Sequence, residues 1–425
     1  ALARHCAELY DFLKSANPKL AVGFNLKGIY GVNRIWRNAV YHPFFEGKID
    51  FSPFDVGGMD ARLDSRTGAM VSEIRSYKMA RTLNFSYQEG GNALEFALCM
   101  AFNPQKYVPG YGYEGGPSGW GAARAFSPEA EFFREYNDRY YTETENVADV
   151  AVVRTWPSMA YSVAATLVPT ILIEQVLIQH KVPFDILFDG QIDRIDRYRA
   201  VILPGQESLS QEWVDRLSAY VRGGGTLVFT GNTADFNERR ERRAANPLLA
   251  LMGAPARPAA ITVKTVGQGK VVCIPEVGRQ ARGRATAAGD ETEVEVATGG
   301  RADFPASQWL LPPNHEEIHH AIADNARGGL SIASAAPLNT VMELLNRKKS
   351  SETIVHFVNF EQGKRLDSFE VRLRKQFPGK VSSVKVFSPD SDEPISAQFK
   401  EEAGRVVFQV PSMGLYSMAV VSHQP

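Results

Sequence analysis

Two carboxylates in this sequence are each followed by a pair of glycines, a pattern that could present an acidic side chain to a pocket. Glu89 stands in NFSYQEGGN and Asp55 in DFSPFDVGG, each just after a short apolar segment. Glycine accepts backbone conformations that other residues avoid, so the chain could turn sharply at either place. The alternative for Glu89 is a solvated loop residue, and for Asp55 a helix cap or turn aspartate. Both are candidates for catalytic carboxylates, Glu89 first.

Polar and aromatic residues gather in the loops around these carboxylates. Asn25 ends the apolar segment LAVGFN, and its amide could bond a ligand hydroxyl, although loop asparagines commonly form turns. The aromatic rings could form a platform for a ligand or line a domain interface. They are Tyr30, Trp36, Tyr87, Tyr111, Tyr113 and Trp120. We take Asn25, Trp36, Tyr87 and Trp120 as candidate ligand-binding residues.

The sharpest formal motif is His315-Glu-Glu-Ile-His319, which matches the zinc-binding pattern H-E-x-x-H. On a helix this spacing puts two imidazoles on one face, with a glutamate as base. Pro312 and Pro313 lie just before it, with Asn314 between, which places His315 in the first helical turn, and no G-x-x-H continuation follows. We therefore predict a solvated linker helix capped by Asn314 and no metal site. A zinc hydrolase using His315 and His319 is the less favoured alternative.

No segment predicts a cofactor site. Gly223, Gly224 and Gly225 follow a helical pattern and precede a strand, the reverse of the order that aims backbone amides at a phosphate. These glycines are interpreted as a helix stop. We expect no cofactor.

The composition indicates a globular protein with more than one domain. The 425 residues are 44% hydrophobic and 22% charged, with 47 Lys and Arg against 48 Asp and Glu. This balance favours neither nucleic acid nor an anionic membrane as a partner. The longest apolar run, 161–176, contains Pro169 and Glu174 and is too short to span a bilayer. The three cysteines lie far apart in apolar contexts and are expected to be buried thiols.

The elements that would position the candidate residues fall into successive blocks. Residues 1–148 alternate helical and strand patterns with long loops, which indicates part of a parallel α/β barrel. The expected strands are 20–25, 48–57 and 84–88, and the expected helices are 2–15, 72–84 with Ser72 as its cap, and 93–102.

The remaining blocks predict two further domains. Residues 149–277 alternate buried strands with helices and indicate a doubly wound α/β domain. Its expected strands are 150–155, 184–190, 198–205, 226–231 and 269–275, and its expected long helices are 159–180 and 210–225. Residues 278–340 are expected to form a loop insertion and a linker helix. Residues 341–425 show period-2 strands and predict a small antiparallel β-sandwich.

The order of these blocks resembles family 42 glycoside hydrolases, which are β-galactosidase-like enzymes. The resemblance is carried by AVILPGQESLSQEWVDRLSAYVRGGGTLVFTG and by the closing pattern from HFVNF through VFSPD to VVFQVPSMGLYSMAVV. It implies an α/β fold: the second half of a TIM barrel, then a class I amidotransferase-like domain used in trimerisation, then a small C-terminal β domain. The turn Phe229-Thr-Gly-Asn-Thr-Ala234 lacks the amidotransferase cysteine, so the central domain is expected to be a non-catalytic scaffold.

The resemblance also implies a chemistry for the candidate residues. Hydrolysis of a glycosidic bond needs two carboxyl groups facing one pocket, and Glu89 would serve as nucleophile with Asp55 as second carboxylate or stabiliser. Counting strands back from the central domain makes LAVGFN the fifth, so the acid/base carboxylate is expected upstream of residue 1. The expected partner is a carbohydrate substrate, with a homotrimer implied by the resemblance. The alternative is a catalytically inactive carbohydrate-binding or oligomerisation scaffold.

Overall fold

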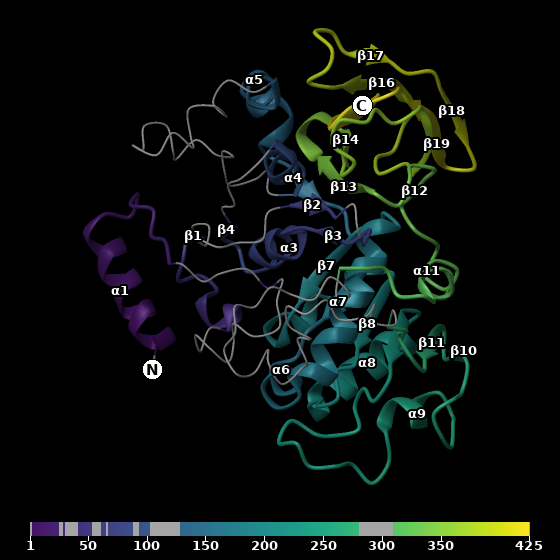
Figure 1. The fold of residues 1–425 in the computed structure, drawn as a ribbon. Helices are drawn as coiled ribbons and strands as arrows, with labels where there is room; N and C mark the ends of the chain where they lie inside the picture. Colours follow the sequence, from purple (N-terminus) through teal and green to yellow (C-terminus); the bar gives the residue numbers. More distant parts are fainter. Residues whose placement is uncertain are drawn as a thin grey trace.

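The computed structural model describes residues 2–24, 29, 41–52, 61–64, 67–87, 93–102, 128–279 and 309–424. Figure 1 shows three regions, with the first block beside a teal central sheet and two green and yellow sheets at the C-terminal end. Among these residues, no helix is both long and apolar enough to cross a membrane. All three cysteines are buried, as predicted.

The first block contains a short parallel sheet surrounded by helices. β1 and β4 pair in parallel, with Phe51 opposite Ser86, and Gly23 forms a parallel bridge to Phe51 on the other side. β2 and β3 form a separate antiparallel pair. The bounds are α1 Leu2–Ala16, η1 His42–Phe45, β1 Phe51–Ser52, β2 Arg62–Leu63, β3 Met70–Val71, α3 Ile74–Thr82, β4 Ser86–Tyr87, α4 Ala93–Phe102, α5 Pro128–Tyr136, η3 Asn137–Tyr141 and β5 Glu145–Asn146.

The predicted start of the helix at 72–84 was wrong. α3 begins at Ile74, and its N-cap residue is Glu73 rather than Ser72. The reason is that the Glu73 carbonyl accepts the first backbone hydrogen bonds of the helix, from Ser76 and Tyr77. The Glu73 side chain also accepts a hydrogen bond of 2.6 Å from the Ser76 hydroxyl.

The central sheet has six strands in the order β10-β11-β9-β8-β6-β7. All neighbours are parallel except the edge strand β10, which is antiparallel to β11. The five parallel strands were predicted from their apolar runs, whereas the expected helix 159–180 is divided at Ser162. The bounds are β6 Val150–Val153, α6 Trp156–Tyr161, α7 Val163–Gln179, β7 Phe184–Leu187, η4 Asp189–Arg197, β8 Ala200–Pro204, α8 Gln211–Arg222, β9 Thr226–Thr230, α9 Pro247–Leu251, β10 Thr262–Val266 and β11 Gly269–Ile274.

Helices cover both faces of this sheet. Val150 and Val152 of β6 belong to the core that contains Val176 of α7. Their neighbour Ala151 belongs to a second core with Leu217 of α8. Because successive strand residues point to opposite faces, α7 and α8 lie on opposite sides of the sheet.

The last block contains two antiparallel sheets that share one core. Their orders are β12-β15-β19-β18 and β17-β16-β20-β14-β13-β5, so β5 of the first block joins this sheet through β13. Leu344 and Phe357 from one sheet meet Val371 and Val406 from the other. The bounds are α11 His315–Ala323, β12 Ile332–Ser334, β13 Thr340–Arg347, η6 Lys348–Ser350, β14 Glu352–Asn359, β15 Phe369–Arg374, β16 Val381–Phe387, β17 Ile395–Ser396, β18 Phe399–Glu402, β19 Arg405–Val410 and β20 Tyr416–His423.

Candidate functional site

The carboxyl ends of three neighbouring parallel segments define the edge where the sequence candidates are expected. Gly23, β1 and β4 lie side by side and run in the same direction. Parallel strands present their carboxyl ends at one edge, which is where barrel enzymes place their catalytic loops. In the chain, Asn25 follows the first segment, Asp55 the second and Glu89 the third. These three residues, with Trp36 and Trp120, lie outside the described residues.

Tyr87 is the one predicted site residue that the structure describes. Its side chain is fully buried in the core. Its ring packs edge-on against Tyr77, with the ring centroids 5.9 Å apart. From this position Tyr87 supports the strand edge, and a contact between Tyr87 and a substrate stays a prediction.

A pocket of about 470 Å³ lies between the first block and the central sheet. Tyr41 packs against both Phe44 and Trp156, and the Tyr41 and Trp156 ring centroids are 4.5 Å apart. Phe44 and Trp156 keep 53% and 36% of their surface exposed, so their rings are accessible to a ligand. Flat aromatic surfaces with a few polar groups are typical of sites for small organic ligands. The pocket carboxylates are Glu46, Asp189 and Glu212.

Asp189 is held firmly at this pocket. It accepts hydrogen bonds from the backbone amide of Trp156 at 2.6 Å and from the Trp213 indole at 3.0 Å. The Tyr41 hydroxyl donates a third at 3.4 Å. Burial raises the pKa of Asp189, and the hydrogen bonds to its carboxylate oppose that shift. The nearby Glu46 accepts a hydrogen bond of 2.9 Å from Gln191.

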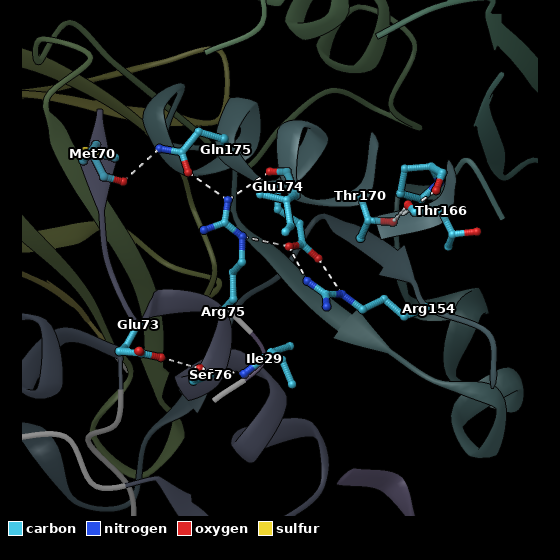
Figure 2. A network of polar contacts seen from close by, with 12 residues as sticks. Ile29, Met70, Glu73, Arg75, Ser76, Arg154, Thr166, Thr170, Glu174 and Gln175 are labelled. Atoms are coloured by element: carbon cyan, nitrogen blue, oxygen red, sulfur yellow. Dashed lines mark hydrogen bonds and ion pairs between the residues drawn. The ribbon is translucent and has the colours of Figure 1, made fainter. Parts of the chain in front are cut away.

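A buried ion network joins the first block to the central sheet (Figure 2). Glu174 of α7 accepts hydrogen bonds from Arg75 of α3 at 2.9 Å and from Arg154, which follows β6, at 2.6 and 2.9 Å. The side chains of Arg75 and Glu174 are fully buried. Burial lowers the pKa of Arg75 to about 10, against the opposing effect of Glu174. One buried carboxylate thus pairs with two guanidinium groups that are shielded from water.

The same helix, α3, is also bound to the C-terminal sheets. Lys78 donates to Glu343 of β13 at 2.8 Å and to the Phe184 carbonyl of β7 at 2.9 Å. Arg81 forms a second ion pair with Glu343. α3 therefore contacts both the central sheet and the C-terminal sheets through buried charges.

The H-E-x-x-H motif lies where α11 meets the end of α7. α11 begins at His315, as predicted, but Asn314 does not cap it through its side chain. That side chain instead accepts from the Gly278 amide and donates to the Glu276 carbonyl. The His315 Nδ1 lies 2.9 Å from Nε2 of His180, at the C-cap of α7.

The His180 imidazole is the most strongly perturbed group of this cluster. Burial, with the nearby imidazoles of His319 and His315, lowers the pKa of His180 to about 3. Burial likewise lowers the pKa of His319. Both rings are therefore neutral at physiological pH, the form in which histidine can bind a metal.

The comparison with a family model concerns the central sheet. Residues 175–254 match the model described as the β-galactosidase trimerisation domain. No curated protein is significantly similar to the sequence.

Solved structures resemble the chain over nearly its whole length. A family 42 β-galactosidase from G. stearothermophilus has a TM-score of 0.60 at 13% identity, covering 97% of this chain and 65% of its own. The chain has the fold of the family 42 β-galactosidases. A cold-adapted β-galactosidase from Rahnella sp. R3 has a TM-score of 0.61 at 13% identity, covering 99% of this chain and 66% of its own. The chain thus spans less than two thirds of the length of either enzyme.

The structures similar to this chain also include an enzyme whose name gives a different activity. α-L-fucosidase isoenzyme 2 from Paenibacillus thiaminolyticus has a TM-score of 0.57 at 15% identity, covering 100% of this chain and 71% of its own. At these identities the likeness concerns the fold alone.

Neither Asp189 nor His180 was identified from the sequence as a candidate site residue. Asp189 lies within the expected strand 184–190 and just beyond the observed strand β7, and a carboxylate at the end of a buried parallel strand was an available signal. His180 had none, because its partner His315 lies 135 residues further along the chain. Only the packing of α11 on α7 brings these imidazoles together.

Proposed function

We propose that this chain is part of a glycoside hydrolase of the β-galactosidase-like type, acting on a glycosidic bond of an oligosaccharide or glycoside. The observation that carries the proposal is the edge formed by Gly23, β1 and β4. Two acidic residues, Asp55 and Glu89, follow β1 and β4 within three residues in the chain. The likeness of the whole chain to family 42 β-galactosidases and to an α-L-fucosidase supports it.

In this proposal each candidate residue has a separate role. Glu89 is the nucleophile, and Asp55 is the second carboxylate or a stabiliser of the positive charge that develops on the sugar ring. Asn25 bonds a sugar hydroxyl. Trp36 and Trp120 offer ring faces to the C–H groups of a pyranose. A contact between Tyr87 and the sugar requires that its buried ring become exposed.

The proposed domain division follows the same reasoning. Residues 1–148 form the second half of a (β/α)8 barrel, and residues 149–277 an amidotransferase-like domain without catalysis. Residues 278–340 form an insertion and linker helix, and residues 341–425 a β-sandwich. Support for a non-catalytic central domain comes from Cys273, which is fully buried in β11 and whose thiol pKa burial raises.

Replacement of Glu89 by glutamine tests the proposal. The variant keeps the shape of the side chain but loses the nucleophilic charge, so turnover of a panel of aryl glycosides should fall by several orders of magnitude. Sugar binding, measured by calorimetry, should survive. The matched control is Glu8→Gln, which changes an exposed carboxylate on α1 and should leave turnover unchanged. Unchanged turnover in Glu89→Gln would rule this assignment out.

A catalytically inactive carbohydrate-binding scaffold is the second candidate, and the aromatic pocket at Trp156 favours it. Under this alternative no aryl glycoside is turned over, and sugar binds at the pocket. Trp156→Ala should then weaken binding by roughly tenfold or more, since loss of stacking costs about 1–3 kcal/mol in comparable ring contacts. Under the leading proposal, Trp156→Ala leaves the chemical step intact.

A further inference from the structure

Four of the eight histidines meet where the end of α7 contacts α11. They are His180, His315, His319 and His320. The His180 and His319 rings are stacked, with centroids 4.2 Å apart and planes 14° apart. His180 and His315 are linked through their ring nitrogens at 2.9 Å. Two helices far apart in the chain thus converge on one group of imidazoles.

Two of these imidazoles and a neighbouring carboxylate form a group that is close enough to share one ion. One ligand atom each from His180, Glu316 and His319 lies within 4.8 Å of the other two. A tetrahedral Zn²⁺ with bonds of about 2.0–2.1 Å separates its ligands by about 3.4 Å. Small rotations of the side chains would close the difference. The Glu316 side chain is 61% exposed, and its carboxylate lies 3.8 Å from Nδ1 of His315, whereas the His180 and His319 imidazoles are stacked on each other.

We propose that His180, Glu316 and His319 form a binding site for a divalent transition metal. Two imidazoles and a carboxylate suit Zn²⁺ and its neighbours rather than Mg²⁺ or Ca²⁺, which prefer oxygen ligands alone. Three protein ligands leave a fourth position for water. The ion would link α11 to α7. It would thereby hold α11, which follows the central sheet in the chain, against the helix that covers one face of that sheet. The proposal does not depend on glycoside hydrolysis.

This arrangement differs from the catalytic use of H-E-x-x-H. In that use the two histidines of the motif bind zinc and its glutamate acts as base. In this structure the three side chains close enough to bind one ion are His180, Glu316 and His319, so His180 takes the place of His315 and Glu316 is a ligand. His315 instead contacts the His180 ring and can hold its orientation.

Some of the charges around the proposed site favour binding of a cation, and others oppose it. His180 is the C-cap of α7, so the negative end of the helix dipole favours a cation. Glu316 adds a negative charge. Lys181 opposes binding, although its ammonium group is turned to the carbonyls of Gln179 and Pro337. The start of α11 also opposes it, being the positive end of a helix.

The test is titration of the chelator-treated protein with ZnCl2, followed by calorimetry and by the thermal unfolding midpoint. We expect one Zn²⁺ per chain and a midpoint that rises with free zinc, because the ion binds only the folded arrangement. His180→Ala and His319→Ala should each weaken binding at least tenfold. His320→Ala is the matched control, because His320 is 66% exposed on the same helix and outside the group, and it should bind as the unchanged protein does.

A second measurement does not depend on any variant. Crystals of the unchanged protein soaked in ZnCl2 should show an anomalous difference peak between His180 and His319. Absence of zinc binding in solution, or zinc binding that survives both His180→Ala and His319→Ala, would overturn the proposal. A peak elsewhere with none at this group would do so as well.

Discussion

His356 lies in the middle of β14 with its side chain fully buried. Its Nδ1 is 2.6 Å from the Tyr416 hydroxyl, which is 2.7 Å from the Tyr141 hydroxyl. Burial, with a smaller contribution from Arg81, lowers the pKa of His356 to about 3. The imidazole is therefore a neutral member of a hydrogen-bonded chain between the first block and the C-terminal sheets.

This low pKa predicts a loss of stability in acid. In the unfolded chain a histidine has a pKa of about 6.5, so between about pH 6.5 and 3 the unfolded state binds the extra proton. The His356 contribution to the free energy of unfolding should fall by about 1.4 kcal/mol for each pH unit below 6.5. His356→Gln, which cannot titrate, should show a correspondingly shallower pH dependence in denaturant unfolding. Equal slopes for the two proteins would contradict this account.

Single residues were predictable where local chemistry decides their place. The cysteines are buried as their apolar neighbours indicated. Asn314 occupies the N-cap position of α11, as predicted, but its side chain bonds to the segment at Glu276 and Gly278 rather than to the helix. A tertiary contact thus replaced the local capping hydrogen bond. The local sequence pattern cannot predict which of the two the side chain will form.

At the scale of elements, α3 forms buried ion pairs with both the central region and the C-terminal sheets. Its Arg75 reaches Glu174 of α7, while its Lys78 reaches Glu343 of β13. Figure 1 shows α3 between the central sheet and the C-terminal sheets. Buried ion pairs of this kind depend on both partners, because each charge left alone would face a medium that solvates it poorly.

Loss of the Glu174 charge should therefore destabilise the protein strongly. Glu174→Gln removes the buried carboxylate charge that is hydrogen-bonded to the guanidinium groups of both Arg75 and Arg154. We expect the free energy of unfolding to fall by about 3–5 kcal/mol, measured by urea denaturation. Glu238→Gln, an exposed carboxylate in the same region, should change it by less than about 0.5 kcal/mol. A loss as small as that of the control would show that the network contributes little.

The elements themselves were predictable to different degrees. Buried strands such as β8 and β9 were recognised because every residue in them is apolar or nearly so. β10 was missed because three of its five residues are exposed, so it lacks an apolar run, although it forms a tight hairpin with β11. In the first block, the strand expected at 48–57 appears as Phe51–Ser52 within the described residues. The carboxylate candidates beyond such strands stay predictions.

At the scale of the whole molecule, the matched trimerisation domain concerns assembly. We propose that the protein is a homotrimer. Analytical ultracentrifugation of the native protein should give three times the chain mass found under denaturing conditions. A monomer across micromolar concentrations would contradict the proposal and leave the central sheet without an assembly role.

The pairing of β5 with β13 has a consequence for how the protein is made. Glu145 lies opposite Asn346, so about 200 residues, including the whole central sheet, separate the two partners in the chain. At roughly 5–20 residues per second on the ribosome, β5 waits on the order of 10–40 seconds for its partner. The nascent central sheet must therefore fold while a loose strand precedes it. β5 can join its sheet only after β13 has been made, which is later than every strand of the central sheet.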